Sequence, residues 1–192
     1  MNQSAQLIIV AITSAIGIAI GGCGTTPTAG DAMAPTQQQL PSIGGSCNTR
    51  YHDPVEGVGL DSPLGWTVDA CISVSCNAAW SNGAGSAITL YVVPLDPAGL
   101  RAHVDKWVAA YGAANPGRQF GGSVTVSFFN GKSGIANTWY DPGGGGLQPV
   151  AFLELWQAGT KGQAILFSGI VVEPTQAKQS VVGNVGLSLC AD

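Results

Sequence analysis

Apolar residues recur along most of the chain at one of two spacings, and these spacings predict the regular structure. Stretches rich in β-branched and aromatic residues, such as AITLYVV at residues 87–93, favour strands. Over residues 97–111 the spacing becomes that of a helix, and the apolar residues form one stripe. The residues of this stripe are Leu100, Val104, Trp107, Val108 and Tyr111. We therefore expect an amphipathic helix at 97–111, with Trp107 buried against a sheet.

Further segments have strand patterns, and a second helix is expected near the C-terminal end. The other expected strands span residues 51–60, 66–72, 123–129, 132–140, 149–158 and 163–172. Asn130-Gly131 predicts a tight hairpin turn, and residues 77–86 (NAAWSNGAGS) are expected to form a loop. Pro174 opens a helical segment that runs to Leu189. The apolar residues of this helix are Val181, Val185 and Leu189. The order β-β-β-α-β-β-β-β-α predicts an α+β fold, a single antiparallel sheet flanked by two helices.

The chain begins with a short apolar segment that ends at a cysteine. Residues 7–20, LIIVAITSAIGIAI, are fourteen uncharged residues, fewer than the roughly 20 that span a membrane but typical of the apolar part of a signal peptide. The next residues, Ile20-Gly21-Gly22-Cys23, resemble the lipobox of bacterial lipoproteins, in which an aliphatic residue and two small ones precede an obligatory cysteine.

The lipobox resemblance implies that residues 1–22 are a signal peptide and that Cys23 is lipidated and becomes the new N-terminus. Its lipid would comprise a diacylglyceryl group and a further acyl chain such as palmitate. Two or more chains hold a protein stably on a membrane, whereas a single chain binds only marginally. A simple secretory signal and an uncleaved anchor helix are the alternatives. MNQSAQ at residues 1–6 lacks the Lys and Arg that usually open a signal peptide, which counts against the lipobox interpretation.

Residues 24–46 separate the cysteine from the rest of the chain. They contain three prolines and one charged residue, and they have no apolar period. This composition is typical of a linker. The expected organisation is a signal peptide at 1–22, a lipidated cysteine and flexible tether at 23–46, and one folded domain at 47–192.

The domain opens with Tyr51-His52-Asp53-Pro54, followed by the segment 60–66 with its Pro-Leu-Gly-Trp end. These residues resemble the start of domains of the PsbP-like family. The family includes the photosystem II extrinsic protein PsbP, a Ran-binding nuclear import factor and actinobacterial LpqN-type lipoproteins. The resemblance implies a PsbP-like α+β sandwich over nearly the whole domain. Because these members have different functions, it implies almost nothing about activity.

Four cysteines follow the lipidation candidate: Cys47, Cys71, Cys76 and Cys190. An even number of cysteines in an exported chain predicts two disulfides. Of the three connectivities we favour Cys71–Cys76, because these residues are close in sequence, which leaves Cys47–Cys190 to join the two ends of the domain. The chain has only two histidines and no C-x₂-C pair, so no metal site is expected.

Composition and motifs argue against nucleic-acid binding and catalysis. Charged residues make up 9% of the chain, the net charge is −4, and no basic stripe is present to contact phosphates. Ser133-Gly134 and Ser168-Gly169 both lack the G-x-S-x-G nucleophile elbow. The glycine run at 143–146 is not followed by the Lys-Ser/Thr of a P-loop. We therefore expect no enzyme activity and no cofactor.

Two residues are candidates for binding. Trp80 falls in the expected Gly/Asn/Ser loop, where an exposed tryptophan can anchor a partner or a sugar, although it can also fold back over the sheet. His52, with Asp53 and Glu56, could be an acid–base pair or a ligand set, or simply the polar start of a strand. Trp139 and Trp156 lie in expected strands and are predicted to belong to the core.

These features favour an exported lipoprotein that acts as a non-catalytic accessory or protein-interaction module. The alternative is a small-molecule or glycan-binding module of the cell envelope, and a hydrolase of unrecognised type is a third hypothesis. The expected location is the outer membrane or the outer face of the cytoplasmic membrane, with the domain outside the cytoplasm. The expected partners are the membrane, through the lipid, and an envelope protein or a small ligand.

Overall fold

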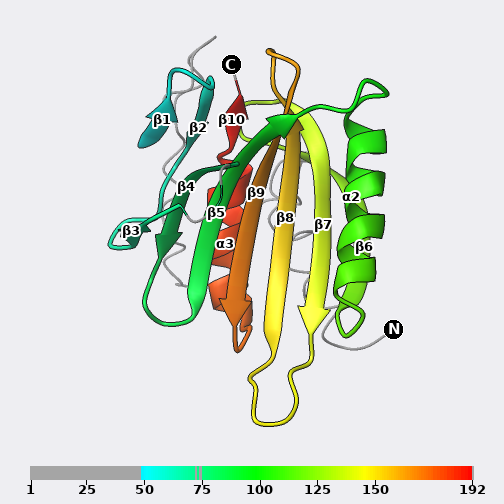
Figure 1. Cartoon of the computed structure of the whole chain (residues 1–192). Helices are drawn as coiled ribbons and strands as arrows, with labels where there is room; N and C mark the ends of the chain where they lie inside the picture. The colour runs from blue at the N-terminus through cyan, green and yellow to red at the C-terminus, as the bar shows by residue number, and fades with distance from the viewer. Residues whose placement is uncertain (1–48, 72, 74, 192) are drawn as a thin grey trace, which may run out of the picture.

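The computed structural model describes residues 49–71, 73 and 75–191, which form two helices and two antiparallel sheets (Figure 1). The larger sheet has seven strands in the order β3-β4-β5-β9-β8-β7-β6. Their bounds are β3 Thr67–Asp69, β4 Cys76–Ser81, β5 Ser86–Pro94, β6 Gln119–Ser127, β7 Ser133–Asp141, β8 Val150–Ala158 and β9 Gln163–Val172. The smaller sheet has the order β1-β2-β10. Its strands are β1 Tyr51–Asp53, β2 Val58–Leu60 and β10 Cys190–Ala191, and the helices are α2 Leu100–Ala114 and α3 Gln176–Leu187.

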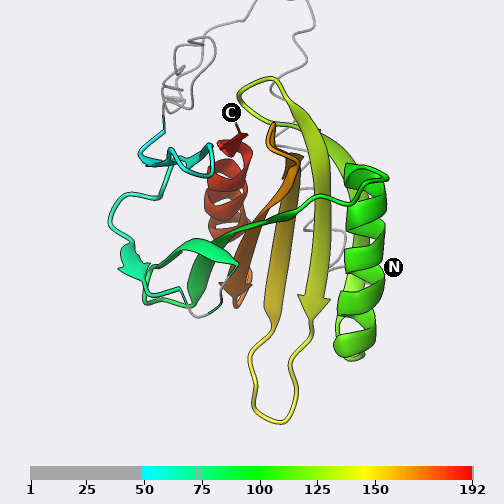
Figure 2. The same cartoon turned by 45° about the horizontal axis from the view of Figure 1, so that its top comes forward.

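The two helices pack on opposite faces of the seven-stranded sheet. Consecutive side chains of a strand point to opposite faces, so on β8 Leu155 faces α3 whereas Glu154 and Trp156 face α2. α3 lies against β5, β8 and β9, and α2 lies against β7 and β8. Figures 1 and 2 show the sheet between the two helices, with α2 beside β7. The larger hydrophobic core fills the space between the sheet and α3, and a smaller cluster lies under α2.

Glycines allow α3 to approach the sheet closely. A Cβ at Gly186 would lie 2.3 Å from Leu155 Cδ1 and 2.8 Å from Phe167 Cε1. On β9, a Cβ at Gly169 would lie 2.3 Å from Val182 Cγ1. Real Cβ atoms do not come so near their neighbours, so both positions require glycine unless the helix moves away.

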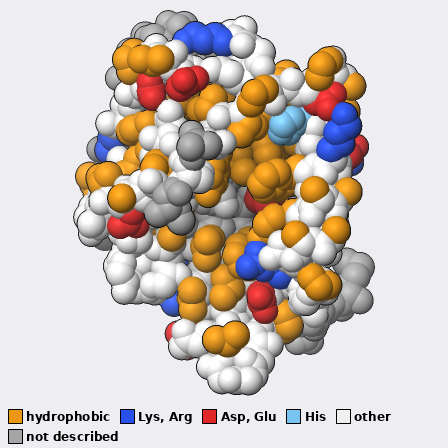
Figure 3. All heavy atoms as spheres, viewed as in Figure 1, with side chains coloured by type: hydrophobic (Ala, Val, Ile, Leu, Met, Phe, Trp, Pro, Cys, Tyr) orange, Lys and Arg blue, Asp and Glu red, His pale blue; other side chains and the backbone are white. Residues whose placement is uncertain are grey.

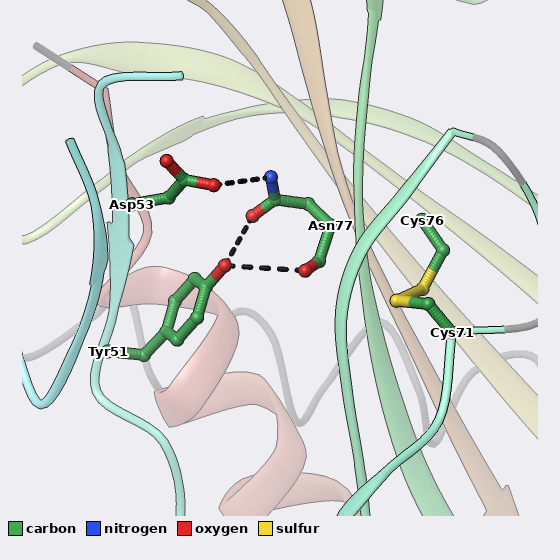
Figure 4. The surroundings of a disulfide bond; sticks show 5 residues. All are labelled: Tyr51, Asp53, Cys71, Cys76 and Asn77. Atoms are coloured by element: carbon green, nitrogen blue, oxygen red, sulfur yellow. Dashed lines mark hydrogen bonds between the residues drawn. A yellow bond between two sulfur atoms is a disulfide. The ribbon is translucent and has the colours of Figure 1, made fainter. Parts of the chain in front are cut away.

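A polar contact between β1 and β4 joins the small sheet to the large one. Asp53 Oδ2 accepts a hydrogen bond of 2.9 Å from Asn77 Nδ2, and the Tyr51 hydroxyl donates one of 2.5 Å to Asn77 Oδ1 (Figure 4). The Tyr51 ring also packs edge-on against Trp80, with centroids 5.2 Å apart. Burial acts to raise the pKa of Asp53. The hydrogen bonds from Asn77 and from two backbone N–H groups outweigh this effect, and the pKa is lowered.

The disulfide predicted between Cys71 and Cys76 is confirmed. Their sulfur atoms are 2.07 Å apart, and the bond closes the turn that leads into β4 (Figure 4). Cys190 is also disulfide-bonded. Its expected partner, Cys47, lies outside the described residues, as does the proposed lipidation site Cys23.

The α+β class, the antiparallel pairing and the two helices agree with the sequence-based expectation, but the single sheet and several boundaries were wrong. The expected strand 51–60 is instead a hairpin, because Asp53 accepts hydrogen bonds from the N–H groups of Val55 and Glu56 and Gly57 has a φ of 66°. The second expected strand, 66–72, is shortened to β3. In the described residues, five strands precede α2 and a short strand follows α3.

The loop expected at 77–86 was wrong for its first half. Residues up to Ser81 belong to β4, and Trp80 pairs with Ile88 of β5. Burial of Ala78 and Trp80 in the core favours the strand more than the local Asn and Ser residues disfavour it. The turn itself is shorter than expected, because Asn82 Oδ1 accepts hydrogen bonds from the N–H groups of Ala84 and Ser86.

The last helix is shorter than expected, and its buried stripe is different. Thr175 caps the N-terminus of α3 by accepting a hydrogen bond from the Lys178 N–H. Val182, Val185 and Gly186 face the sheet, whereas Val181 is exposed. Leu189 is buried but lies beyond the end of the helix. Among the described residues, neither helix is long and apolar enough to cross a membrane.

Candidate functional site

Five polar residues form a row across the face of the sheet that α2 covers in part. Thr89 pairs with Ser168, Ser168 with Glu154, Glu154 with Asn137, and Asn137 with Ser123. Residues directly opposite each other in antiparallel strands have side chains on the same face. These residues therefore form a polar row that crosses β5, β9, β8, β7 and β6.

Apolar residues border the polar row on both sides. One neighbouring row consists of Tyr91, Leu166, Trp156 and Ile135, and the other of Ala87, Ile170, Phe152 and Trp139. Both rows lie two positions along the strands from the polar row and so point to the same face. Glu154, in the middle of the polar row, is therefore an acidic side chain in largely aromatic surroundings.

α2 covers only one side of the polar row. Glu154 is 3% exposed and Asn137 is fully buried, whereas Ser168 and Thr89 are half-buried. The space-filling view shows a hollow in this face, with hydrophobic side chains gathered around it between β5 and α2 (Figure 3). We refer to this part of the sheet face, which carries Thr89, Ser168 and Glu154 beside Trp107 of α2, as the groove.

Three N–H groups hold the carboxylate of Glu154. Oε1 accepts a hydrogen bond of 3.0 Å from Trp107 Nε1. Oε2 accepts hydrogen bonds of 3.3 Å from Asn137 Nδ2 and from Trp139 Nε1. Burial raises the pKa of Glu154 by more than these hydrogen bonds lower it, so its pKa lies above the ordinary value. The indole N–H of Trp156 also acts to lower the pKa of Glu154, but it forms no hydrogen bond of ordinary geometry.

The aromatic rings around Glu154 are in contact with one another. The centroids of Trp107 and Trp156 are 5.4 Å apart, and Trp107 stacks on Tyr111 at 5.9 Å. Tyr111 lies 4.9 Å from Trp139. His103 packs edge-on against Trp156, with ring centroids 5.2 Å apart. The aromatic cluster joins α2 to β7 and β8.

Arg118 lies at the same cluster, but its charge is directed elsewhere. Its guanidinium is 4.1 Å from the centroid of Phe152 and 5.3 Å from that of Tyr111. It forms an ion pair of 3.8 Å with Asp141 and donates a hydrogen bond to the Tyr111 hydroxyl. Burial raises the pKa of Tyr111 despite the opposing effect of Arg118.

The expectation that Trp107 is buried was wrong. Trp107 is 36% exposed, although Val104 on the same helix is fully buried. The helical stripe is directed towards the sheet as expected. The Trp107 ring lies at the edge of the stripe, where its N–H reaches Glu154 and part of the ring remains exposed. The predicted burial of Trp139 and Trp156 is confirmed.

The two predicted binding residues lie away from the groove. Trp80 belongs to β4 and is 4% exposed, which leaves little of its ring for a ligand. His52 lies on β1 with its side chain exposed. Asp53 accepts a hydrogen bond from Asn77, and Glu56 accepts one from Gln163. The two carboxylates therefore take part in separate structural contacts and do not form one site with His52. Among the described residues, no three His, Cys, Asp or Glu are grouped to hold a metal ion.

Sequence reasoning overlooked Glu154. One signal was available, since Glu154 is the single charged residue within the apolar strand VAFLELWQA and shares a strand face with Trp156. An acidic residue in such a strand is expensive to bury and so requires partners. Its partners come from Trp107 and Asn137, which are distant in sequence.

Comparison with known proteins identifies a similar fold. No family model matches the chain, and no curated protein sequence matches it. The solved structure of the Ran-binding protein Mog1p of Saccharomyces cerevisiae aligns with a TM-score of 0.51 and 9% sequence identity, over 73% of this chain and 93% of that one. A variant of protein Mog1 aligns with a TM-score of 0.46 and 11% identity, over 72% and 85% of the two chains. At this identity the Mog1p likeness shows a shared fold alone.

Proposed function

We propose that the protein is an exported, lipid-anchored binding protein of the cell envelope, without catalytic activity, that takes up a small molecule in the groove. The observation that carries this proposal is the polar row of Thr89, Ser168 and Glu154, which lies between two rows of apolar and aromatic residues and is only half-buried at Thr89 and Ser168. Ligand sites are typically concave and largely apolar, with a few converging polar groups. The groove has this composition.

The absence of a catalytic arrangement in the groove supports a binding role. Glu154 is held by three neutral donors, and neither Ser168 nor Thr89 is hydrogen-bonded to it. Nucleophilic catalysis needs a base in hydrogen-bond reach of the nucleophile. The lipobox-like residues around Cys23 support the membrane anchor and the envelope location. The PsbP-like resemblance fits the α+β fold that the chain shares with Mog1p. The Ran binding of that protein is not proposed for this chain.

A second candidate is the protein-interaction module, and the edge strand β6 favours it. β6 ends the large sheet, spans nine residues and contains no charged residue. Phe120 and Val124 on this strand are exposed. An uncharged edge strand can pair with an extended segment of a partner.

Native mass spectrometry of the protein purified from its own membranes tests the binding function. We expect a small molecule to copurify. Ser168→Phe, which fills the groove at a half-buried position, should abolish this copurification. Ala177→Phe, on the exposed surface of α3, is the matched control and should retain the molecule. A parent protein with no bound molecule, or a folded Ser168→Phe variant that still carries it, would contradict the proposal.

A further inference from the structure

Glu154 is a buried acidic group without a compensating cation. It forms no ion pair with any Lys, Arg or His of the described residues. Arg118, which lies over Phe152, pairs with Asp141 instead. Burying a charge is costly unless an opposite charge or strong hydrogen bonds compensate for it. A positively charged ligand would supply the compensation that the described residues lack.

The donors around Glu154 indicate which cations fit. Trp107 donates to Oε1, and Asn137 and Trp139 donate to Oε2. These neutral N–H groups occupy most of the acceptor positions of the carboxylate but do not cancel its charge. The carboxylate can therefore still attract a cation, but it has little capacity left to accept hydrogen bonds. A methylated ammonium ion suits such a site, because it carries charge and needs few or no hydrogen bonds.

The aromatic side chains next to Glu154 also favour a methylated ammonium. Tyr111 contacts both Trp107 and Trp139, whose N–H groups bind the carboxylate, and Trp107 presents part of its ring to solvent. The faces of aromatic rings attract cations, tryptophan most strongly, and groups of such rings typically bind quaternary ammonium ligands. In the groove, the ring attraction and the carboxylate charge act on the same ligand.

A ligand can approach Glu154 from the side of β9. On the β7 side, Asn137 is fully buried, so a ligand cannot reach Glu154 from there. On the other side, Ser168 lies directly opposite Glu154 and is half-buried, as is Thr89 beyond it. The hollow in Figure 3 lies over this part of the sheet.

Resting on the proposed function, we propose that the ligand of the groove is a small methylated ammonium compound whose charged head lies beside Glu154 and the Trp107 ring. The methyl groups pack against the aromatic rings, and the remainder of the ligand extends over Ser168 towards β5. Glu154 thus selects a positively charged ligand in addition to accepting hydrogen bonds from Trp107 and Trp139.

Titration calorimetry on the purified protein tests the ligand class. The probes are choline, tetramethylammonium and neohexyl alcohol, which is the uncharged carbon analogue of choline. We expect choline to bind about 10-fold or more tightly than neohexyl alcohol, since cation–aromatic attraction in a desolvated site adds to the carboxylate charge. Equal affinities for the two probes, or no binding of either cation, would overturn the proposal. This comparison is made within one protein and does not depend on the folding of a variant.

Two variants locate the effect at Glu154. Glu154→Gln should reduce the preference for choline to about 2-fold or less, because it removes the charge and keeps the shape. Asp105→Asn removes the same charge from an exposed position on α2 and should leave the preference unchanged. A folded Glu154→Gln protein with the full preference would refute the role of Glu154. If a small molecule copurifies but the charged probes do not bind, the ligand class is wrong and the binding function stands.

Discussion

Trp107 on α2 donates a hydrogen bond of 3.0 Å from its indole nitrogen to Oε1 of Glu154 on β8, 47 residues further along the chain. This bond joins α2, which packs mainly against β7 and β8, to the middle of the polar row. It gives Trp107 two roles, since the N–H contacts a buried carboxylate while part of the ring remains exposed. The position of α2, the charge state of Glu154 and the shape of the groove therefore depend on one another.

Glu154→Gln should change the pH dependence of stability. Burial raises the pKa of Glu154 above its ordinary value of 4.5, so between that value and the raised pKa the folded protein binds more protons than the unfolded chain. The unfolding free energy of the parent therefore falls as pH rises through this range. The variant lacks this pH dependence, because glutamine does not titrate. Urea unfolding between about pH 4 and pH 8 should show the parent losing stability relative to Glu154→Gln.

The control for this measurement is Asp105→Asn, because Asp105 has an exposed side chain on the same helix as Trp107. Its curve should run parallel to that of the parent across the whole range. Parallel curves for the parent and Glu154→Gln would show that Glu154 has no raised pKa.

Trp107→Phe should destabilise the protein by about 1–3 kcal/mol, because it leaves Glu154 Oε1 without its donor while keeping most of the ring contacts. Chemical denaturation measures the change. The loss should be smaller when the substitution is made in the Glu154→Gln background, since a double-mutant cycle isolates the interaction of two residues in contact. Additive effects of the two substitutions would mean that the charge of Glu154 does not strengthen this hydrogen bond, since the glutamine oxygen can still accept it.

Gly186→Ala should destabilise the protein by about 1–3 kcal/mol, the usual effect of overpacking a close contact. The added methyl group would clash with Leu155 and Phe167, which hold the sheet side of α3. Gly183→Ala in the same helix is the matched control, because the nearest atom to its Cβ, on Leu153, is 3.9 Å away. That variant should be neutral or gain up to about 1 kcal/mol from helix propensity. Equal thermal stabilities for the two variants would contradict the packing of α3.

Replacing both Cys71 and Cys76 by serine should cost about 2 kcal/mol, the loop-closure entropy of a short disulfide loop. Urea unfolding measures the cost, and peptide mapping without reduction should show the two cysteines linked in the parent. Free, alkylatable thiols at these positions in protein taken from its own compartment would contradict the bond.

Cys23→Ala should abolish lipid labelling and either release the protein from the membrane fraction or leave its signal segment uncleaved. The reason is chemical, since only the Cys23 thiol in the lipobox-like segment can accept the diacylglyceryl group. A variant that is labelled and membrane-bound like the parent would show that the anchor lies elsewhere.

Local patterns predicted those parts of the fold that depend on neighbouring residues. The stripe that begins at Leu100 predicted α2 to within a few residues, and Asn130-Gly131 predicted the turn between β6 and β7. The disulfide of Cys71 and Cys76 joins residues close in sequence and was predictable for the same reason. In each case the determining interactions are made within one turn of helix, one hairpin or one short loop.

Tertiary structure decided which residues meet in the groove. Thr89, Ser168, Glu154 and Asn137 come from four strands, and only the pairing register places them side by side. A shift of one residue in any of these pairings would turn part of the row to the other face. Trp80 was expected in a loop but is held in β4 by burial in the core, and Trp107 was expected in the core but lies at its edge because Glu154 binds its N–H. The sequence determined which positions are apolar and which element most segments form. The relative placement of distant segments determined which of those side chains are buried.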